Sequence, residues 1–190
     1  MKFKSNVKDY LLHLKGFIDK ETCEKTLKEM QNINYTQHLF YNPKVDKSDT
    51  RSGDKELDVS YDNVSTKKEI MNKLWFAIKQ YQENLNYPWF QVWQGYSEIR
   101  LNKYSETKKM ALHADHIHQL FEGKRKGIPI LSVLGLLNDD FEGGEFIILD
   151  DQEIKFKQGD VLVFPSNLMF PHKVEPVTKG TRYSFISWVW

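Results

Sequence analysis

The sequence predicts a mostly β protein, a jelly roll buttressed by N-terminal helices, and three observations lead to this prediction. Short strand-like segments separated by turn residues fill the C-terminal half, with no helical pattern between them, which favours a sandwich or barrel over a βαβ sheet. Two amphipathic helical patterns occupy the N-terminal half. No internal repeat or low-complexity linker interrupts the chain, so we expect one domain over 1–190, with helical support and a long loop in about 1–89 and the jelly roll in about 90–190.

The helical patterns come first along the chain. One helix is expected to run through Met30, with Asp19 or Thr22 as its cap. A second, stronger helix is expected over about 65–84, with Ser65 as its cap. Its apolar residues recur at three- and four-residue steps, at Ile70, Leu74, Ile78 and Tyr81. Such a stripe indicates a face that packs on a sheet.

The segment between the two helices, residues 42–58, is polar and contains Pro43 and Gly53, so it is expected to be a loop. It is longer than the usual connection between elements. Loops of that length often serve as lids or binding loops.

The expected strands begin after the second helix. They cover residues 92–104, 128–137, 146–149, 154–156, 161–164 and 183–190. The run 128–137 is continuously apolar, as expected for a strand covered on both faces. Turn residues separate the later strands at Gly143–Gly144, Asp150–Asp151 and Gly159–Asp160.

Composition limits the classes of partner. The 27 basic and 26 acidic residues give a formal charge of +1, without the basic field of a protein that holds nucleic acid. The single cysteine, Cys23, excludes an intramolecular disulfide and is expected to be a half-buried helical thiol. No signal-peptide core and no window of about 20 apolar residues is present, so we expect a cytoplasmic protein without a membrane partner.

A candidate metal site is the first sign of chemistry. His113 and Asp115 lie two residues apart, and on extended chain such residues project to the same side. His172, which follows the strand over 161–164, can supply a third ligand. Two histidines and one carboxylate on one face of an octahedron leave three positions open, the arrangement typical of non-haem Fe(II) oxygenases. A tetrahedral zinc site from His113, Asp115, His116 and His118 is the alternative, and it leaves His172 without a role.

A candidate carboxylate receptor lies on the last strand. Arg182 and Ser184 share one face of it, and a guanidinium offers two parallel hydrogen bonds to a carboxylate while a hydroxyl adds another. The apolar neighbours of Arg182 argue against an ordinary surface arginine. Trp188 shares the same face by the period of two, so it is a candidate wall of the pocket.

The order of these motifs resembles the 2-oxoglutarate/Fe(II) oxygenase superfamily. The ordered set is His113-x-Asp115, Gly143-Gly144-Glu145-Phe146, Gly159-Asp160, His172 and Arg182-x-Ser184. The likeness covers about residues 98–190 and is greatest to prolyl 4-hydroxylases, including compact microbial and phage-borne members. It implies a double-stranded β-helix, with Fe(II) on His113, Asp115 and His172 and with O2 and 2-oxoglutarate as co-substrates. Arg182 and Ser184 would hold the distal carboxylate of 2-oxoglutarate, Tyr104 matches a tyrosine that often binds the co-substrate, and ascorbate is a further candidate cofactor.

The resemblance also bears on the substrate. Thr50-Arg51-Ser52-Gly53 resembles the mobile substrate loop of prolyl hydroxylases, so Arg51 and Trp188 are the candidate substrate-binding residues. Many prolyl 4-hydroxylases carry lysine where this chain has Arg182, and the longer arginine- and asparagine-containing signature of nucleic-acid dealkylases is absent. The expected substrate is a peptidyl proline. A free amino acid or small molecule, and a sensor without turnover, are the alternatives, and we expect a monomer or weak homodimer in the cytoplasm, that of the host if phage-borne.

Overall fold

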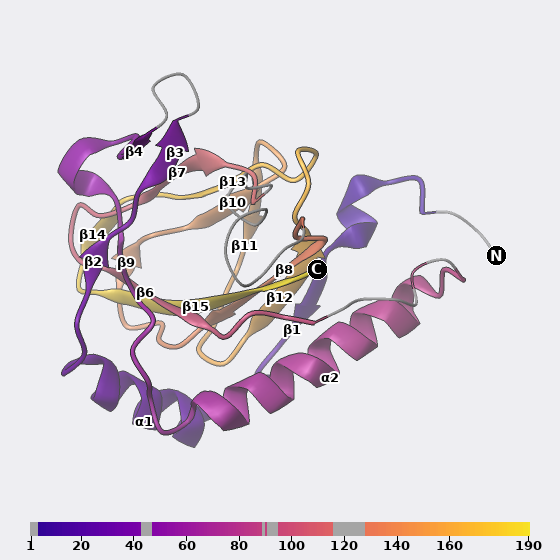
Figure 1. The fold of residues 1–190 in the computed structure, drawn as a ribbon, viewed down its shortest axis with the longest axis horizontal. Coiled ribbons are helices and arrows are strands. Elements are labelled where there is room, and N and C mark those ends of the chain that lie inside the picture. The colour runs from indigo at the N-terminus through magenta and orange to yellow at the C-terminus, as the bar shows by residue number, and fades with distance from the viewer. Residues whose placement is uncertain (1–3, 43–46, 89, 91–94, 116–127) are drawn as a thin grey trace.

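Two β-sheets packed face to face form the body of the protein, and two helices cover the outer side of the larger sheet (Figure 1). This computed structural model describes residues 4–42, 47–88, 90, 95–115 and 128–190. The arrangement confirms the predicted mostly β jelly roll with supporting helices.

The larger sheet has seven antiparallel strands and is called the major sheet below. In spatial order its strands are β1 (Leu12–Leu14), β12 (Val161–Pro165), β8 (Leu131–Leu136), β15 (Arg182–Val189), β6 (Arg100–Tyr104), β5 (Asp58–Ser60) and β2 (Thr36–Gln37).

The minor sheet has four antiparallel strands. In order they are β11 (Gln152–Ile154), β10 (Phe146–Ile148), β13 (His172–Val174) and β7 (Met110–His113). Two short hairpin-like pairs complete the strands, β14 (Val177–Lys179) with β9 (Glu142–Gly143) and β3 (Phe40–Asn42) with β4 (Lys47–Asp49). Two short 3-10 helices are present as well, η1 (Val7–Tyr10) and η2 (Gly53–Lys55).

Both predicted helices form, with one difference at a cap. Helix α1 (Lys20–Met30) begins at Asp19, whose carboxylate accepts a hydrogen bond of 2.8 Å from the amide of Thr22. Helix α2 (Lys67–Leu85) begins one residue later than expected. The prediction of Ser65 as its cap is wrong, because the amide of Ser65 donates instead to Glu29, on α1.

The predicted apolar stripe of α2 packs against the major sheet. Its members Ile70, Leu74, Ile78 and Tyr81 are all buried in one cluster with residues of the sheet. The thiol of Cys23 belongs to the same cluster and is fully buried, where half burial was predicted. Burial raises the pKa of this thiol to about 12, so it stays protonated and unreactive at neutral pH.

Alternation along the central strands divides the interior into two layers. On β12, Val161 and Val163 face the helices, whereas Leu162 and Phe164 belong to a second cluster between the two sheets. Strand β15 follows the same rule, with Phe185 on the helix side and Ile186 and Trp188 between the sheets. The residues with even numbers on β15 therefore point into the space between the sheets, where the candidate site lies.

The N-terminal half supplies more than helices. Strand β1 pairs with β12 at one edge of the major sheet, and β5 and β2 extend the other edge beyond β6. The segment predicted as a polar loop, residues 42–58, contains β4 and η2 and leads into β5. Of the predicted strand over 92–104, only β6 is a strand among the described residues. The strands β1, β2, β4 and β5, which the sequence did not predict, have two or three residues each, too few for an alternating pattern to be recognised.

No helix in the described part of the chain combines the length and the apolar character needed to span a bilayer.

Candidate metal and carboxylate site

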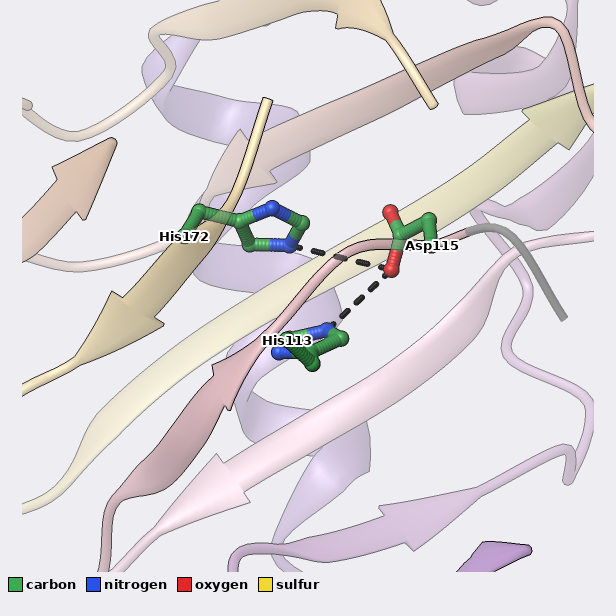
Figure 2. A group of neighbouring side chains, drawn as sticks. All are labelled: His113, Asp115 and His172. Atoms are coloured by element: carbon green, nitrogen blue, oxygen red, sulfur yellow. Dashed lines mark hydrogen bonds and ion pairs between the residues drawn. The ribbon is translucent and has the colours of Figure 1, made fainter. Parts of the chain in front are cut away.

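Three potential metal ligands converge between the sheets (Figure 2). His113 ends β7 and His172 begins β13, and these two residues are direct partners across the antiparallel pair. Asp115 follows two residues after His113 and points back at both rings. Its Oδ1 lies 3.1 Å from Nε2 of His113 and 3.7 Å from Nε2 of His172. One ligand atom from each residue lies within 4.8 Å of the others, so one ion can reach all three.

Backbone carbonyls set the orientation of both imidazole rings. Nδ1 of His113 lies 2.9 Å from the carbonyl oxygen of Ala111, and Nδ1 of His172 lies 3.1 Å from that of Phe170. A carbonyl can only accept, so Nδ1 carries the proton in each ring and the Nε2 lone pair faces the centre. Three electron-pair donors then face one another, which is repulsive unless a cation lies between them. The donor set therefore fits a bound metal ion.

Burial and neighbouring groups hold His172 and Asp115 in the protonation states that a metal needs. Burial, together with the nearby His113, lowers the pKa of His172 to about 4, so its ring is neutral at pH 7. Burial opposes ionisation of Asp115, but His172, His113 and the hydroxyl of Ser132 hold the pKa of this carboxyl well below its usual range. A neutral imidazole at His172 and an ionised carboxylate at Asp115 are the forms that bind Fe(II), and with His113 they leave coordination positions open.

A second layer of hydrogen bonds supports Asp115. The hydroxyl of Ser132, on β8, donates to Oδ2 of Asp115 at 2.6 Å and lies 2.8 Å from the hydroxyl of Ser166. Both serines are buried. This contact holds the carboxylate so that Oδ1 remains directed at the two histidines.

Replacing Ser132 with alanine is expected to weaken metal binding, because the ligating carboxylate loses the group that orients it. Loss of a group that hydrogen-bonds to a metal ligand typically lowers the metal affinity about 10–100-fold. Titration of the protein with Mn(II) in a calorimeter measures the change. Ser166→Ala, one hydrogen bond farther from the carboxylate, is the matched control and should have a smaller effect. Equal metal affinity in Ser132→Ala and the unmodified protein would contradict this role of Ser132.

Arg182 also lies in the interior between the two sheets. It begins β15, is 1% exposed, and pairs across the sheet with Tyr104. Its Nη1 donates to the Ser184 hydroxyl at 3.1 Å, and its guanidinium carbon lies 5.0 Å from the centre of the Tyr104 ring. Tyr104, Ser184 and Arg182 are thus brought together as predicted.

The charge of Arg182 is not balanced by an anion in the part of the chain that the structure describes. No carboxylate of the described residues lies within 4.0 Å of its guanidinium. Burial lowers its pKa, yet a guanidinium remains charged in proteins. A buried charge without a partner is strongly unfavourable. Arg182 also borders a pocket of about 260 Å3 lined in part by Leu136, Phe146 and Phe156. A bound anion is the evident partner for this residue.

Of the two predicted substrate residues, Arg51 lies beside the strand that carries His113. Its Nη1 donates a hydrogen bond of 2.6 Å to the carbonyl oxygen of Leu112, and its guanidinium carbon lies 4.3 Å from the centre of the Phe40 ring. Phe40 in turn lies 5.5 Å from the ring of His113. The loop before η2 therefore lies next to the strand that ends at His113.

Trp188, the other predicted residue, faces the interior from β15. It is the direct partner of Ser132 across the major sheet, so it lies near the support of Asp115. Its indole N–H is buried and has no hydrogen-bond acceptor among the described residues.

Several residues of the site were missed by the sequence analysis. Arg100 lies on the same face of β6 as Tyr104 and is buried against Trp188, and the period of two along the predicted strand could have revealed it. Ser132 stands in an apolar run, where a lone serine was the only signal. His38 and Phe40 carry no sequence signal. His116 and His118, the extra ligands of the alternative zinc site, lie outside the described residues.

Comparisons with known proteins agree with this geometry. Residues 99–190 match the sequence model of the 2OG-Fe(II) oxygenase superfamily. PKHD-type hydroxylases from Idiomarina loihiensis and Stenotrophomonas maltophilia are each 36% identical to this chain, over 96 and 99 residues. These matches cover 49% and 50% of this chain but only 42% and 43% of the relatives, so the match spans less than half the length of either relative.

Solved structures with the same fold match nearly the whole chain. A viral collagen prolyl hydroxylase from Paramecium bursaria Chlorella virus-1 has a TM-score of 0.62 at 14% identity, covering 95% of this chain and 94% of its own. A Trichoplax adhaerens prolyl hydroxylase, solved with a peptide fragment of the hypoxia inducible factor oxygen degradation domain, has a TM-score of 0.69 at 14% identity, covering 96% and 84%. At this level of identity the likeness concerns the fold.

Proposed function

We propose that this chain, whose residues 99–190 belong to the 2OG-Fe(II) oxygenase superfamily, is an Fe(II)- and 2-oxoglutarate-dependent dioxygenase that hydroxylates an unactivated C–H bond. One observation carries the proposal. An open-sided set of two imidazoles and one carboxylate shares its interior with a buried arginine that has no counter-ion among the described residues. A metal chelated by a dianionic co-substrate satisfies both features at once.

The proposed roles follow from the positions of the side chains. His113, Asp115 and His172 would hold Fe(II), and Arg182 and Ser184 would bind the distal carboxylate of 2-oxoglutarate beside Tyr104. When bound, iron and 2-oxoglutarate activate O2, so that one oxygen atom replaces hydrogen on the substrate as hydroxyl and the other enters succinate as CO2 leaves. The part of the protein is to fix these groups in register and to keep the interior between the sheets dry.

For the substrate, the first of two candidates is a peptidyl proline. The support is the likeness in fold to prolyl hydroxylases over nearly the whole chain, one of them solved with a peptide. The contact of the Arg51 loop with the strand that carries His113 is a further support, since it brings a polar loop to the entrance of the metal site.

A second candidate is a free amino acid or another small acid. The observation that favours it is Arg100, a second buried arginine whose partners among the described residues are all neutral. A peptidyl proline carries no charge that could balance this arginine.

Formation of succinate by the purified protein tests the proposed activity. The protein is given Fe(II), ascorbate and 2-oxoglutarate, with and without a proline-rich peptide. Formation of succinate is the expected result, and stimulation by the peptide with a gain of one oxygen atom on proline would establish the prolyl substrate. Slow turnover at the same rate with and without the peptide would support the dioxygenase activity and exclude the prolyl substrate. Absence of turnover with the metal demonstrably bound would indicate a sensor.

A further inference from the structure

A second buried guanidinium lies in the interior between the sheets. Arg100, on β6, is 6% exposed, and its Nε donates to Oδ1 of Asn102 at 3.0 Å. Its Nη1 lies 3.4 Å from Nδ1 of His38, and its guanidinium carbon lies 5.0 Å from the centre of the Trp188 ring. Each of these contacts is with a side chain that carries no negative charge.

His38 does not balance the charge of Arg100. Burial and the positive charge of Arg100 lower the pKa of His38 to about 3, so the ring is neutral at pH 7 and accepts the hydrogen bond at Nδ1. No carboxylate of residues 4–42, 47–88, 95–115 or 128–190 lies within 4.0 Å of Arg100. That includes Glu56, a buried acid whose oxygens have no hydrogen-bond partner in this part of the chain.

Two paths of contact lead from Arg100 to the metal ligands. Trp188, under the guanidinium, is the direct strand partner of Ser132, which bonds to Asp115. On the other side, the ring of His38 packs edge-on against Phe40 at 4.7 Å, and Phe40 packs against His113 at 5.5 Å. On each path two residues stand between Arg100 and a metal ligand, so Arg100 lies in the layer of side chains that surrounds the ligands.

Arg182 and Arg100 occupy separate places along the same face of two paired strands. Arg182 is the partner of Tyr104, whereas Arg100 is the partner of Ile186, four residues farther along each strand. The distal carboxylate of 2-oxoglutarate accounts for one of these charges, and its other end is assigned to the metal. Arg100 is left over for a different anion.

Unused hydrogen-bond donors accompany the unbalanced charge. The indole N–H of Trp188 has no acceptor among the described residues, although it is buried beneath Arg100. A guanidinium has five N–H groups in a planar fork, of which the described contacts use those on Nε and Nη1. A carboxylate has acceptor capacity for both residues and supplies the missing charge.

We propose that Arg100, together with the Trp188 indole, is the specificity-determining anion receptor of the substrate site, and that the substrate carries a carboxylate close to the C–H bond that is hydroxylated. This proposal rests on the proposed dioxygenase function. Of the two candidate substrate classes, it selects the small acid, such as a free amino acid, over an internal residue of a peptide. Asn102 acts as a positioning residue, because it accepts from Nε and fixes the plane of the guanidinium.

Paramagnetic broadening of a small carboxylate tests the proposal without turnover. The full chain is loaded with Mn(II) and 2-oxoglutarate in the absence of oxygen, and proton spectra of propionate and of propionamide are recorded. Bound near Mn(II), propionate should broaden while the neutral, isosteric propionamide should not. The affinity for 2-oxoglutarate is measured in the same samples by calorimetry, so that failure of the proposed function shows itself separately as absence of 2-oxoglutarate binding.

Variants assign the effect to Arg100. Arg100→Met and Arg100→Gln are each expected to weaken propionate binding by about 10–100-fold, the loss typical of hydrogen bonds to charged groups, with the affinity for 2-oxoglutarate unchanged. Arg100→Lys should restore part of it, since lysine keeps the charge but not the planar fork. Lys103→Met is the matched control, because Lys103 lies on the same strand but contacts Tyr35, and it should bind propionate normally.

Three results would overturn the proposal. Equal broadening of propionate in Arg100→Met and the unmodified protein would show that the acid binds elsewhere, and equal broadening of acid and amide would show that charge is not read. A fall in 2-oxoglutarate affinity in Arg100→Met would place Arg100 in the co-substrate site. Thermal unfolding of each variant guards against misfolding, since a purely structural arginine would lower the melting temperature when replaced.

Discussion

Replacing Asp115 with alanine is expected to abolish turnover, because the metal loses its only charged ligand from the protein. The carboxylate is buried, ionised and directed at both histidines, so its attraction to a cation is scarcely weakened by water. Loss of one partner from a buried charge pair costs about 3–5 kcal/mol, which corresponds to about 100–4000-fold in metal affinity. Mn(II) binding followed by electron paramagnetic resonance, together with succinate formation, measures both consequences.

Two further variants make the Asp115 experiment specific. Asp115→Asn keeps the shape and removes the charge, so it should resemble alanine if the charge is what matters. Asp151→Ala removes an exposed acid from the turn before β11 and should leave metal binding unchanged. Full activity in Asp115→Ala would refute the assignment of the metal site.

Replacing Arg182 with alanine is expected to raise the requirement for 2-oxoglutarate by about 100-fold, while turnover at saturating 2-oxoglutarate is largely retained. The reason is that a buried, charge-assisted contact is worth about 3 kcal/mol when one partner is removed. The metal ligands do not contact Arg182, so chemistry at the iron should survive. The concentration dependence of succinate formation separates these two effects.

Replacing Arg182 by a neutral residue should stabilise the ligand-free protein while it weakens the binding of 2-oxoglutarate. In the ligand-free protein this guanidinium has no counter-ion among the described residues, so Arg182→Met, which keeps the volume and removes the charge, should raise the free energy of unfolding. Arg182→Lys is the matched variant that keeps the charge, and Ser184→Ala removes only a neutral hydrogen bond and should weaken 2-oxoglutarate binding less. An unchanged 2-oxoglutarate affinity in Arg182→Ala would show that another residue binds the distal carboxylate.

The parts of the molecule that could be predicted are those encoded by local periodicity. The helix over 67–85 appears in the sequence as a three- and four-residue step of apolar side chains, and burial against the sheet follows directly. His113 and Asp115, and likewise Arg182 and Ser184, could be paired because residues two apart on extended chain share a face. In both cases the relevant distance along the chain is short.

The parts that escaped prediction depend on contacts between distant segments. The strands β1, β5 and β2, at the two sides of the major sheet, consist of two or three residues and exist because a neighbouring strand offers them a partner. Arg100 contacts His38, which lies 62 residues away in the chain. Ser132 donates a hydrogen bond to Asp115, which lies outside its strand, and no sequence motif connects the two residues. Which of several polar residues on an inward face reaches the metal is decided by the packing of the two sheets.

The alternation along β15 has a consequence for how such a protein can diversify. Phe185 and Val189 fasten this strand to the helices, while Arg182, Ser184 and Trp188, on its opposite face, belong to the ligand side. Selection for a new substrate can therefore act on alternate residues without loosening the attachment of the strand to its scaffold. The two faces of this eight-residue strand can therefore change separately in evolution, the buried apolar face with the scaffold and the polar face with the ligand.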